Sequence, residues 1–127
     1  NGNTAEKAQG VCPTGFHVGS VPEWNTLIDY LGGTAIAGGK LKETGYDHWL
    51  SPNTGATNET GFGGLPGGFR NSDGSFYNIL TDGYFWSATT SGSLDALFRY
   101  LNSGNALLNT YSGLPKKLGF TVRCIKD

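Results

Sequence analysis

The sequence contains no methionine, only two histidines and two cysteines, and no long apolar run. A membrane-spanning helix needs about 20 consecutive apolar residues, so we expect no transmembrane segment. Clustered positive charge is also lacking, because nine Lys and Arg balance ten Asp and Glu and no basic run exceeds Lys116-Lys117. Since nucleic-acid binding depends on concentrated basic charge, nucleic acid is not expected as a partner.

The scarcity of metal ligands and nucleophiles argues against catalysis. His17 and His48 are far apart and neither cysteine belongs to a Cys-x-x-Cys pair, so a zinc or iron site has almost no support. No nucleophile elbow surrounds any serine. Asp73 could offer a carboxylate to calcium, but a hairpin turn explains its segment without a metal. We therefore predict no enzyme and no cofactor, and keep Asp73 only as a weak metal candidate.

The two cysteines lie near opposite ends of the sequence, at Cys12 and Cys124. A disulfide across so long a loop would stabilise the fold by about 4–5 kcal/mol on the chain-entropy model. The alternative is two buried free thiols in a reducing compartment. We favour the disulfide, which implies an oxidising location. With no starting Met and no signal peptide, we expect one module of a longer secreted or cell-surface protein, with residues 1–10 as a lead-in.

Glycine and aromatic residues, by contrast, are abundant: 21 Gly with three Trp, six Tyr and seven Phe. This combination indicates a folded domain rich in tight turns, and 127 residues suit one domain. Residues 63–76 hold five of the glycines. We expect these to let the chain double back while Leu65, Phe69 and Phe76 anchor it to the core.

Two helices are predicted in the first third of the chain. Residues 21–31 follow a Ser20 cap with Glu23 three positions on, a capping box, and they present apolar residues at helical spacing, namely Trp24, Leu27, Ile28 and Leu31. A second helix is expected at 34–43, weakened by its two glycines. Residues 45–61 form a long polar loop, a kind of segment that is often functional.

The remaining residues alternate as antiparallel strands do. We predict a hairpin of 67–70 and 75–79 around Asp73-Gly74, a strand at 83–89, a hairpin over 96–111 with its turn at 102–105, and a strand at 118–127. In the last of these, Phe120, Val122 and Cys124 are expected to share a core face. Helices followed by strands predict an α+β fold with a small twisted antiparallel sheet.

Five segments occur in an order that is characteristic of one family. They are VCPTGFHVGSVPEW, GGKLKETG, GFGGLPGGFRNSDGSFYNI, YFWSATTSG and GFTVRCIKD. Together they resemble the Fibrobacter succinogenes major paralogous domain, a repeated module of surface and secreted proteins in Fibrobacter and Bacteroidetes-type bacteria. The resemblance implies one C-type-lectin-like domain over 1–127, in the formylglycine-generating-enzyme branch, and it also implies the Cys12–Cys124 pairing. The family usually carries a strand before its Cys-Pro motif, which is missing here or supplied by another chain, and Gly19 and Phe16 replace its usual Pro and Trp.

Sugar-binding surfaces combine exposed aromatics with amides, carboxylates or arginine. The calcium motifs of lectins are absent from this sequence, so calcium is not assigned. The long loop offers Tyr46, Asp47, His48 and Trp49. The hairpin over 96–111 offers Arg99, Tyr100, Asn102, Asn105, Asn109 and Tyr111, of which we keep Arg99, Asn105 and Tyr111 as candidates.

The alternative to a binding role is that the tryptophans are core residues. For Trp49 a binding role and a core position are equally supported, whereas for Trp86 a core position is preferred. Arg70 and Arg123 are expected to bond loop carbonyls or carboxylates.

These features predict a non-catalytic binding or adhesion module of a bacterial surface or secreted protein, with polysaccharide or glycan as the favoured ligand. One alternative is a structural module that contacts another surface-protein subunit through an open strand edge. Another is a variable ligand receptor.

Overall fold

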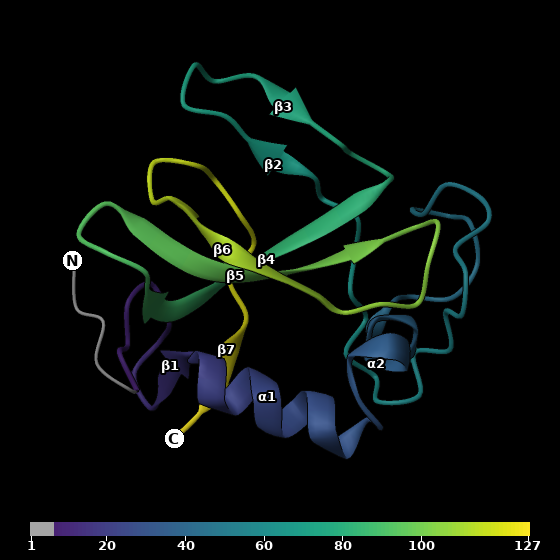
Figure 1. Ribbon diagram of the computed structural model, residues 1–127, viewed down its shortest axis with the longest axis horizontal. Coiled ribbons are helices and arrows are strands. Elements are labelled where there is room, and N and C mark those ends of the chain that lie inside the picture. The colour runs from purple at the N-terminus through teal and green to yellow at the C-terminus, as the bar shows by residue number, and fades with distance from the viewer. Residues whose placement is uncertain (1–6) are drawn as a thin grey trace.

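The computed structural model describes residues 7–127. A three-stranded antiparallel sheet forms its centre, with strands β4 (Asp82–Thr90), β5 (Asp95–Asn102) and β6 (Asn109–Pro115) in that order. The helices α1 (Val21–Tyr30) and α2 (Thr34–Leu41) cover one face, and the hairpin of β2 (Phe69–Arg70) and β3 (Phe76–Tyr77) stands over the other (Figure 1). The predicted α+β class is confirmed. Within residues 7–127, no helix has the length and apolar character needed to cross a membrane.

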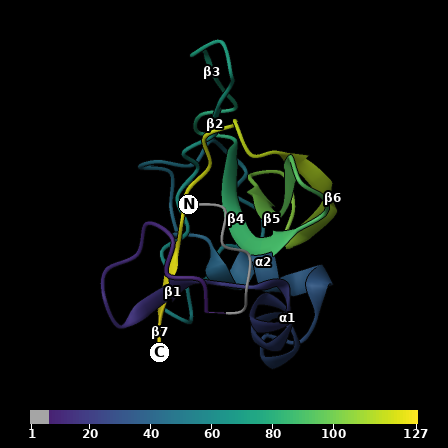
Figure 2. The same cartoon turned by 90° about the vertical axis from the view of Figure 1, so that its left-hand side faces the viewer.

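A second ribbon joins the two ends of the described chain. β1 (Phe16–Val18) pairs antiparallel with β7 (Cys124–Lys126), away from the β2–β3 hairpin (Figure 2). The predicted disulfide is present, with the Cα atoms of Cys12 and Cys124 5.7 Å apart.

The core lies between the central sheet and the helices. Its buried side chains come from the two helices, the residue after α1, the long loop, β4, β5 and the residue before β6: Trp24, Ile28, Leu31, Ala37, Leu41, Trp49, Phe85, Leu101 and Leu108. α1 begins as predicted, because Ser20 caps it and the Glu23 carboxylate accepts hydrogen bonds from the Ser20 backbone N–H and hydroxyl. Its apolar stripe therefore points at Phe85 and Leu101.

α2 forms despite its two glycines, and the packing explains why they are there. A Cβ at Gly38 would collide with the Leu107 carbonyl, and one at Gly39 with the Gly55 carbonyl. The Gly39 N–H also donates to Ala106 O at 2.9 Å. The loops on both sides of α2 thus touch its backbone directly, which only glycine permits.

α2 ends two residues before its predicted end. Lys42 adopts an extended conformation, and its fully buried Nζ donates to the carbonyls of Thr54, Asn102 and Asn105, each at 2.9 Å. Burial lowers the pKa of Lys42 to about 8, and the three carbonyls satisfy all three N–H donors of its ammonium group.

The predicted strands differ from the observed ones mainly in extent. The hairpin over 96–111 is real, but its return strand starts at Asn109, because residues 106–108 pair with α2 instead. The predicted strand at 118–127 is reduced to Cys124–Lys126, whose three residues are all exposed. The expected core face of Phe120, Val122 and Cys124 is therefore wrong: Phe120 packs on the outer face of the central sheet.

The glycine-rich segment is anchored more loosely than expected. Leu65 is 44% exposed and Phe76 is 62% exposed, whereas Phe69 packs among other rings. The turn itself forms as predicted, because the Asp73 carboxylate accepts the Ser75 N–H at 2.8 Å.

Candidate functional site

Aromatic side chains gather on the face of the central sheet that the helices leave open. Alternation along a strand sends Phe85 and Leu101 to the core, so Tyr84 and Tyr100 point to the opposite face. These two tyrosines lie directly across from each other in the register of β4 and β5. The outer face therefore carries aromatic residues from both strands.

Five of these rings form a continuous row, which we call the aromatic ladder. It comprises Tyr77 (β3), Phe69 (β2), Tyr84 (β4), Tyr100 (β5) and Tyr111 (β6). Ring centroids are 5.5 Å apart for Tyr77 and Phe69, 5.4 Å for Phe69 and Tyr84, 5.4 Å for Tyr84 and Tyr100, and 5.5 Å for Tyr100 and Tyr111. Each spacing falls in the range preferred by aromatic pairs.

A close backbone approach joins the hairpin half of the ladder to the sheet half. The Gly68 N–H donates to Asp82 O at 2.8 Å, and Gly68 bridges Gly83. A Cβ at Gly83 would meet the Leu65 carbonyl. Glycine here lets β2 lie against β4, so that Phe69 reaches Tyr84.

A second row of rings supports the ladder from the side. Phe120 stacks on Trp86 with centroids 4.2 Å apart and lies 5.0 Å from Tyr84 and 5.2 Å from Phe98. Trp86 is half-buried and lies outside the core cluster. Its expected place in the core is therefore wrong, because its neighbour Phe85 takes the inward position.

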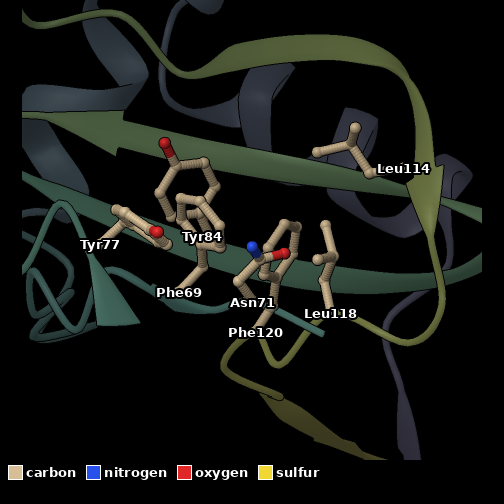
Figure 3. Close-up of a pocket in the computed structure, with 7 residues that line it drawn as sticks. All are labelled: Phe69, Asn71, Tyr77, Tyr84, Leu114, Leu118 and Phe120. Atoms are coloured by element: carbon tan, nitrogen blue, oxygen red, sulfur yellow. The ribbon is translucent and has the colours of Figure 1, made fainter. Parts of the chain in front are cut away.

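A cleft of about 380 Å³ opens between the ladder and the 114–120 segment. Its lining is uncharged and mostly apolar (Figure 3), and consists of Phe69, Asn71, Tyr77, Tyr84, Leu114, Leu118 and Phe120. The side-chain Oδ1 of Asn71 accepts the Ser72 N–H at 2.9 Å, whereas its side-chain Nδ2 has no partner among residues 7–127. Both the size and this mixture of rings with a polar group suit a small-molecule site.

Hydrogen bonds hold the central tyrosine of the ladder in place. The Tyr84 hydroxyl accepts from the Asn78 side chain at 2.9 Å and donates to the Asp82 carboxylate at 3.2 Å. Asp82 also accepts from the Asn102 amide at 2.6 Å. Burial raises the pKa of Tyr84, and burial with a hydrogen bond to Tyr111 raises the pKa of Tyr100. The phenols are therefore neutral at physiological pH.

Trp49 is separated from the other three residues expected in the long loop, because it is buried and they are exposed. Tyr46 is 65% exposed, Asp47 is exposed, and the exposed His48 bonds Glu43 at 2.7 Å. Trp49 is only 1% exposed, and its Nε1 donates to Gly64 O at 3.0 Å. The Trp49 ring thus has no free face for a ligand in this structure.

The candidates on the 96–111 hairpin are also separated. Arg99 is 3% exposed, faces the helices and donates to the Asn25 side chain at 3.1 Å, and burial lowers its pKa. The Asn105 side chain closes its own turn by accepting the Leu107 N–H. Of the seven candidates, only the 55% exposed Tyr111 belongs to the ladder.

Four ladder residues were missed as site candidates, namely Phe69, Tyr77, Tyr84 and Tyr100. Phe69 was assigned to the core, Tyr100 was considered on the hairpin but not kept, and the other two were not singled out. Aromatic residues at alternate positions of three predicted strands were the available signal. The sequence alone does not say which face of the sheet the helices cover.

A polar cluster at the β1–β7 ribbon lies apart from the ladder. The buried His17 ring places Nε2 2.7 Å from a Glu23 carboxylate oxygen and Nδ1 2.7 Å from an Asp127 carboxylate oxygen. Hydrogen bonds to Glu23 and to Asp127 raise the pKa of His17. Both ring nitrogens are occupied, so His17 has none left for a substrate.

Arg123 behaves as expected and bonds loop carbonyls. Its guanidinium donates to Phe62 O at 2.8 Å and to Gly63 O at 3.3 Å, and it lies over the Phe62 ring. Across residues 7–127, no group of three or more His, Cys, Asp or Glu is placed to hold a metal ion.

Comparison with known proteins gives a family for this fold. A family model described as the Fibrobacter succinogenes major domain matches residues 1–126. Neither the search of curated proteins nor that of solved structures found a match. The chain therefore belongs to the Fibrobacter succinogenes major domain family.

Proposed function

We propose that this domain is a non-catalytic binding module whose ligand is a neutral polysaccharide laid across the aromatic ladder. The observation that carries the proposal is the ladder itself: five rings at spacings of 5.4–5.5 Å, on a sheet face that the helices do not cover. Tyr77 is 46% exposed and Tyr111 is 55% exposed, and a contiguous apolar patch with exposed rings is typical of a binding surface.

The chemistry of the ladder matches that of a sugar chain. The C–H faces of a pyranose ring are apolar and pack on aromatic faces, while its hydroxyls need hydrogen-bond partners. Asn71 and the tyrosine hydroxyls supply such partners beside the rings. The seven residues that line the cleft are uncharged, which favours a neutral ligand over an acidic one.

The test is a titration of the domain with neutral β-glucan, mannan and xylan oligosaccharides of increasing length, followed by calorimetry. We expect affinity to rise with chain length, and Tyr77→Ala or Tyr111→Ala to weaken binding about tenfold each. Tyr30→Ala is the matched control, because Tyr30 is 83% exposed on α1 and outside the ladder. Unchanged affinity in both ladder variants, or no binding to any of these oligosaccharides, would refute the proposal.

The absence of catalysis is part of the proposal. What supports it is that the two cysteines are joined and that both His17 nitrogens are bonded to carboxylates. Incubation with the same oligosaccharides, followed by mass spectrometry, should return them intact.

We further infer a C-type-lectin-like fold and a secreted or cell-surface location. A ribbon of the terminal strands, two helices and a second small sheet support the former. The disulfide supports the latter, because such bonds persist in oxidising compartments. Superposition of an experimental structure on lectin-like domains tests the fold, and cell fractionation tests the location.

A further inference from the structure

The outer edge of β7 carries backbone groups that have no hydrogen-bond partner among residues 7–127. Gly15, on the β1 side of the ribbon, lies opposite Asp127, and the Asp127 N–H donates to Gly15 O at 3.0 Å. Gly15 and Asp127 are therefore a pair whose backbone groups point toward each other. Such pairs alternate along an antiparallel ladder. Ile125 therefore bonds β1, whereas Cys124 and Lys126 direct their N–H and C=O groups to the opposite side.

The opposite strand confirms this alternation. On β1, the Phe16 N–H donates to Pro13 O and the Val18 N–H donates to Ala8 O, both away from β7. No residue in 7–127 plays the equivalent role for β7, and its three residues are all exposed. An edge with free N–H and C=O groups is a template for another strand.

We propose that this edge pairs with the same edge of a second copy of the chain, antiparallel, about a two-fold axis at Ile125. Cys124 of one copy then faces Lys126 of the other. These are the residues whose backbone groups point outward, so the pairing forms four hydrogen bonds and joins the two ribbons into one four-stranded sheet. Ile125 meets its own symmetry mate, as residues on an isologous axis must.

Charge fits this register. Because Cys124 lies opposite Lys126 of the other copy, the residue before Cys124 lies opposite the residue after Lys126. Arg123 of each copy therefore faces Asp127 of the other, which gives two such pairs in the dimer. Opposed unlike charges stabilise a sheet and like charges destabilise it. A parallel arrangement would instead set Arg123, Lys126 and Asp127 each against itself. The sequence around β7 therefore complements itself only in the antiparallel sense.

A mainly apolar groove beside the edge, with the charged Glu23 and Arg123 also in its lining, would be covered by the second copy. It has a volume of about 450 Å³, and Ile125, Trp24, Leu27 and Phe62 are among its lining residues. Ile125 of the partner copy would sit next to the first Ile125, on the side of this groove. The β2–β3 hairpin, which carries Phe69 and Tyr77 of the ladder, lies at the end of the molecule opposite β7 (Figures 1 and 2), so pairing through β7 leaves this part of the ladder uncovered.

Sedimentation velocity of the oxidised chain over a concentration series up to about 1 mM tests the pairing. We expect a reversible dimer that Lys126→Pro abolishes, because proline removes one outward N–H, while Lys126→Ala retains it. A wild-type chain that stays monomeric throughout, or equal dimerisation of the two variants, would overturn the proposal.

Charge exchange provides a second test that unfolding cannot imitate. Arg123→Asp and Asp127→Arg should each be monomeric, since each sets like charges opposite one another. An equimolar mixture of the two should form a heterodimer, because every opposed pair is then Arg with Asp. Circular dichroism checks that each variant is folded. No association in the mixture of folded variants would contradict this register.

Discussion

A carboxylate accepts hydrogen bonds but donates none, and this decides the protonation of His17. Both ring nitrogens lie 2.7 Å from carboxylate oxygens, so both must carry protons and the ring is an imidazolium. Burial acts to raise the pKa of Glu23, but hydrogen bonds from Ser20 and His17 lower it overall. The two groups therefore respond to pH in opposite directions.

Stability should depend on pH through this cluster. Because the folded pKa of His17 is raised above its model value of 6.5, its contribution is complete below pH 6.5 and is lost as pH rises through the folded pKa. The contribution of Glu23, whose folded pKa is lowered from 4.5, is complete above pH 4.5 and is lost as pH falls.

Urea unfolding between pH 4 and pH 9 measures this dependence. His17→Gln should remove the decline above pH 6.5, whereas His48→Gln, at an exposed histidine, should retain it. The same decline in both variants would rule out His17 as its source.

Lys42 ties the long loop at Thr54 to the turn at residues 102–105. Its buried ammonium serves carbonyls of residues 54, 102 and 105, so Lys42→Met would leave three acceptors without donors. Since each buried unsatisfied group costs about 1–3 kcal/mol, we expect a loss of at least about 3 kcal/mol in the free energy of unfolding. Lys40→Met, which removes a partly exposed ion pair with Glu59, should cost less than about 1 kcal/mol. Equal effects in chemical denaturation would contradict this role of Lys42.

At the residue scale, several local interactions could be predicted from the sequence. The Ser20–Glu23 capping box, the Asp73 turn, the disulfide and the bonds of Arg123 to loop carbonyls were all predicted, because each depends on short-range stereochemistry or on a pairing with few alternatives. The position of Trp86 was not predicted correctly, because a strand with aromatic residues on both faces does not reveal which face the helices cover.

At the scale of elements, α2 shows how packing overrides propensity. Gly→Ala in a helix normally stabilises by about 1 kcal/mol. Here Gly38→Ala and Gly39→Ala should instead lower the melting temperature, because their Cβ atoms would collide with the Leu107 and Gly55 carbonyls.

Thermal unfolding followed by circular dichroism checks this, with Ala35→Gly as the comparison. Ala35 is exposed on the same helix, so its loss reports propensity alone, about 1 kcal/mol. A higher melting temperature in either alanine variant would mean that the loops do not press on α2.

Element types could be predicted better than their ends. Periodicity located both helices and the central strands, but the strand at 118–127 shrank to Cys124–Lys126 and the return strand of the last hairpin moved to Asn109. In each case backbone groups found partners distant in sequence, such as Thr121 with β4 and Leu108 with Thr34. The ladder could not be predicted for the same reason: its five rings come from five strands, and the sequence does not show how these strands are arranged in space.

At the scale of the whole molecule, the disulfide closes a loop of 112 residues. On the chain-entropy model this lowers the entropy of the unfolded chain and adds about 4–5 kcal/mol of stability. Cys12→Ser with Cys124→Ser should therefore shift the urea midpoint strongly downward, and reductant should do the same to the wild type. An unchanged urea midpoint in both the double variant and the reduced wild type would show that β1 and β7 stay paired without the disulfide.

The pairing of β1 with β7 also sets how the domain can be attached to other chains. The Val18 N–H donates to Ala8 O at 3.0 Å, and Val18 lies opposite Cys124. The first described residues and the last strand therefore lie close together, at the pole away from the β2–β3 hairpin (Figure 1). A domain with adjacent ends can be inserted into a loop of a host protein with little strain on the host. If such domains were joined in tandem, every linker would attach at the same pole, and the β2–β3 hairpin of each domain would point away from the linkers (Figure 1).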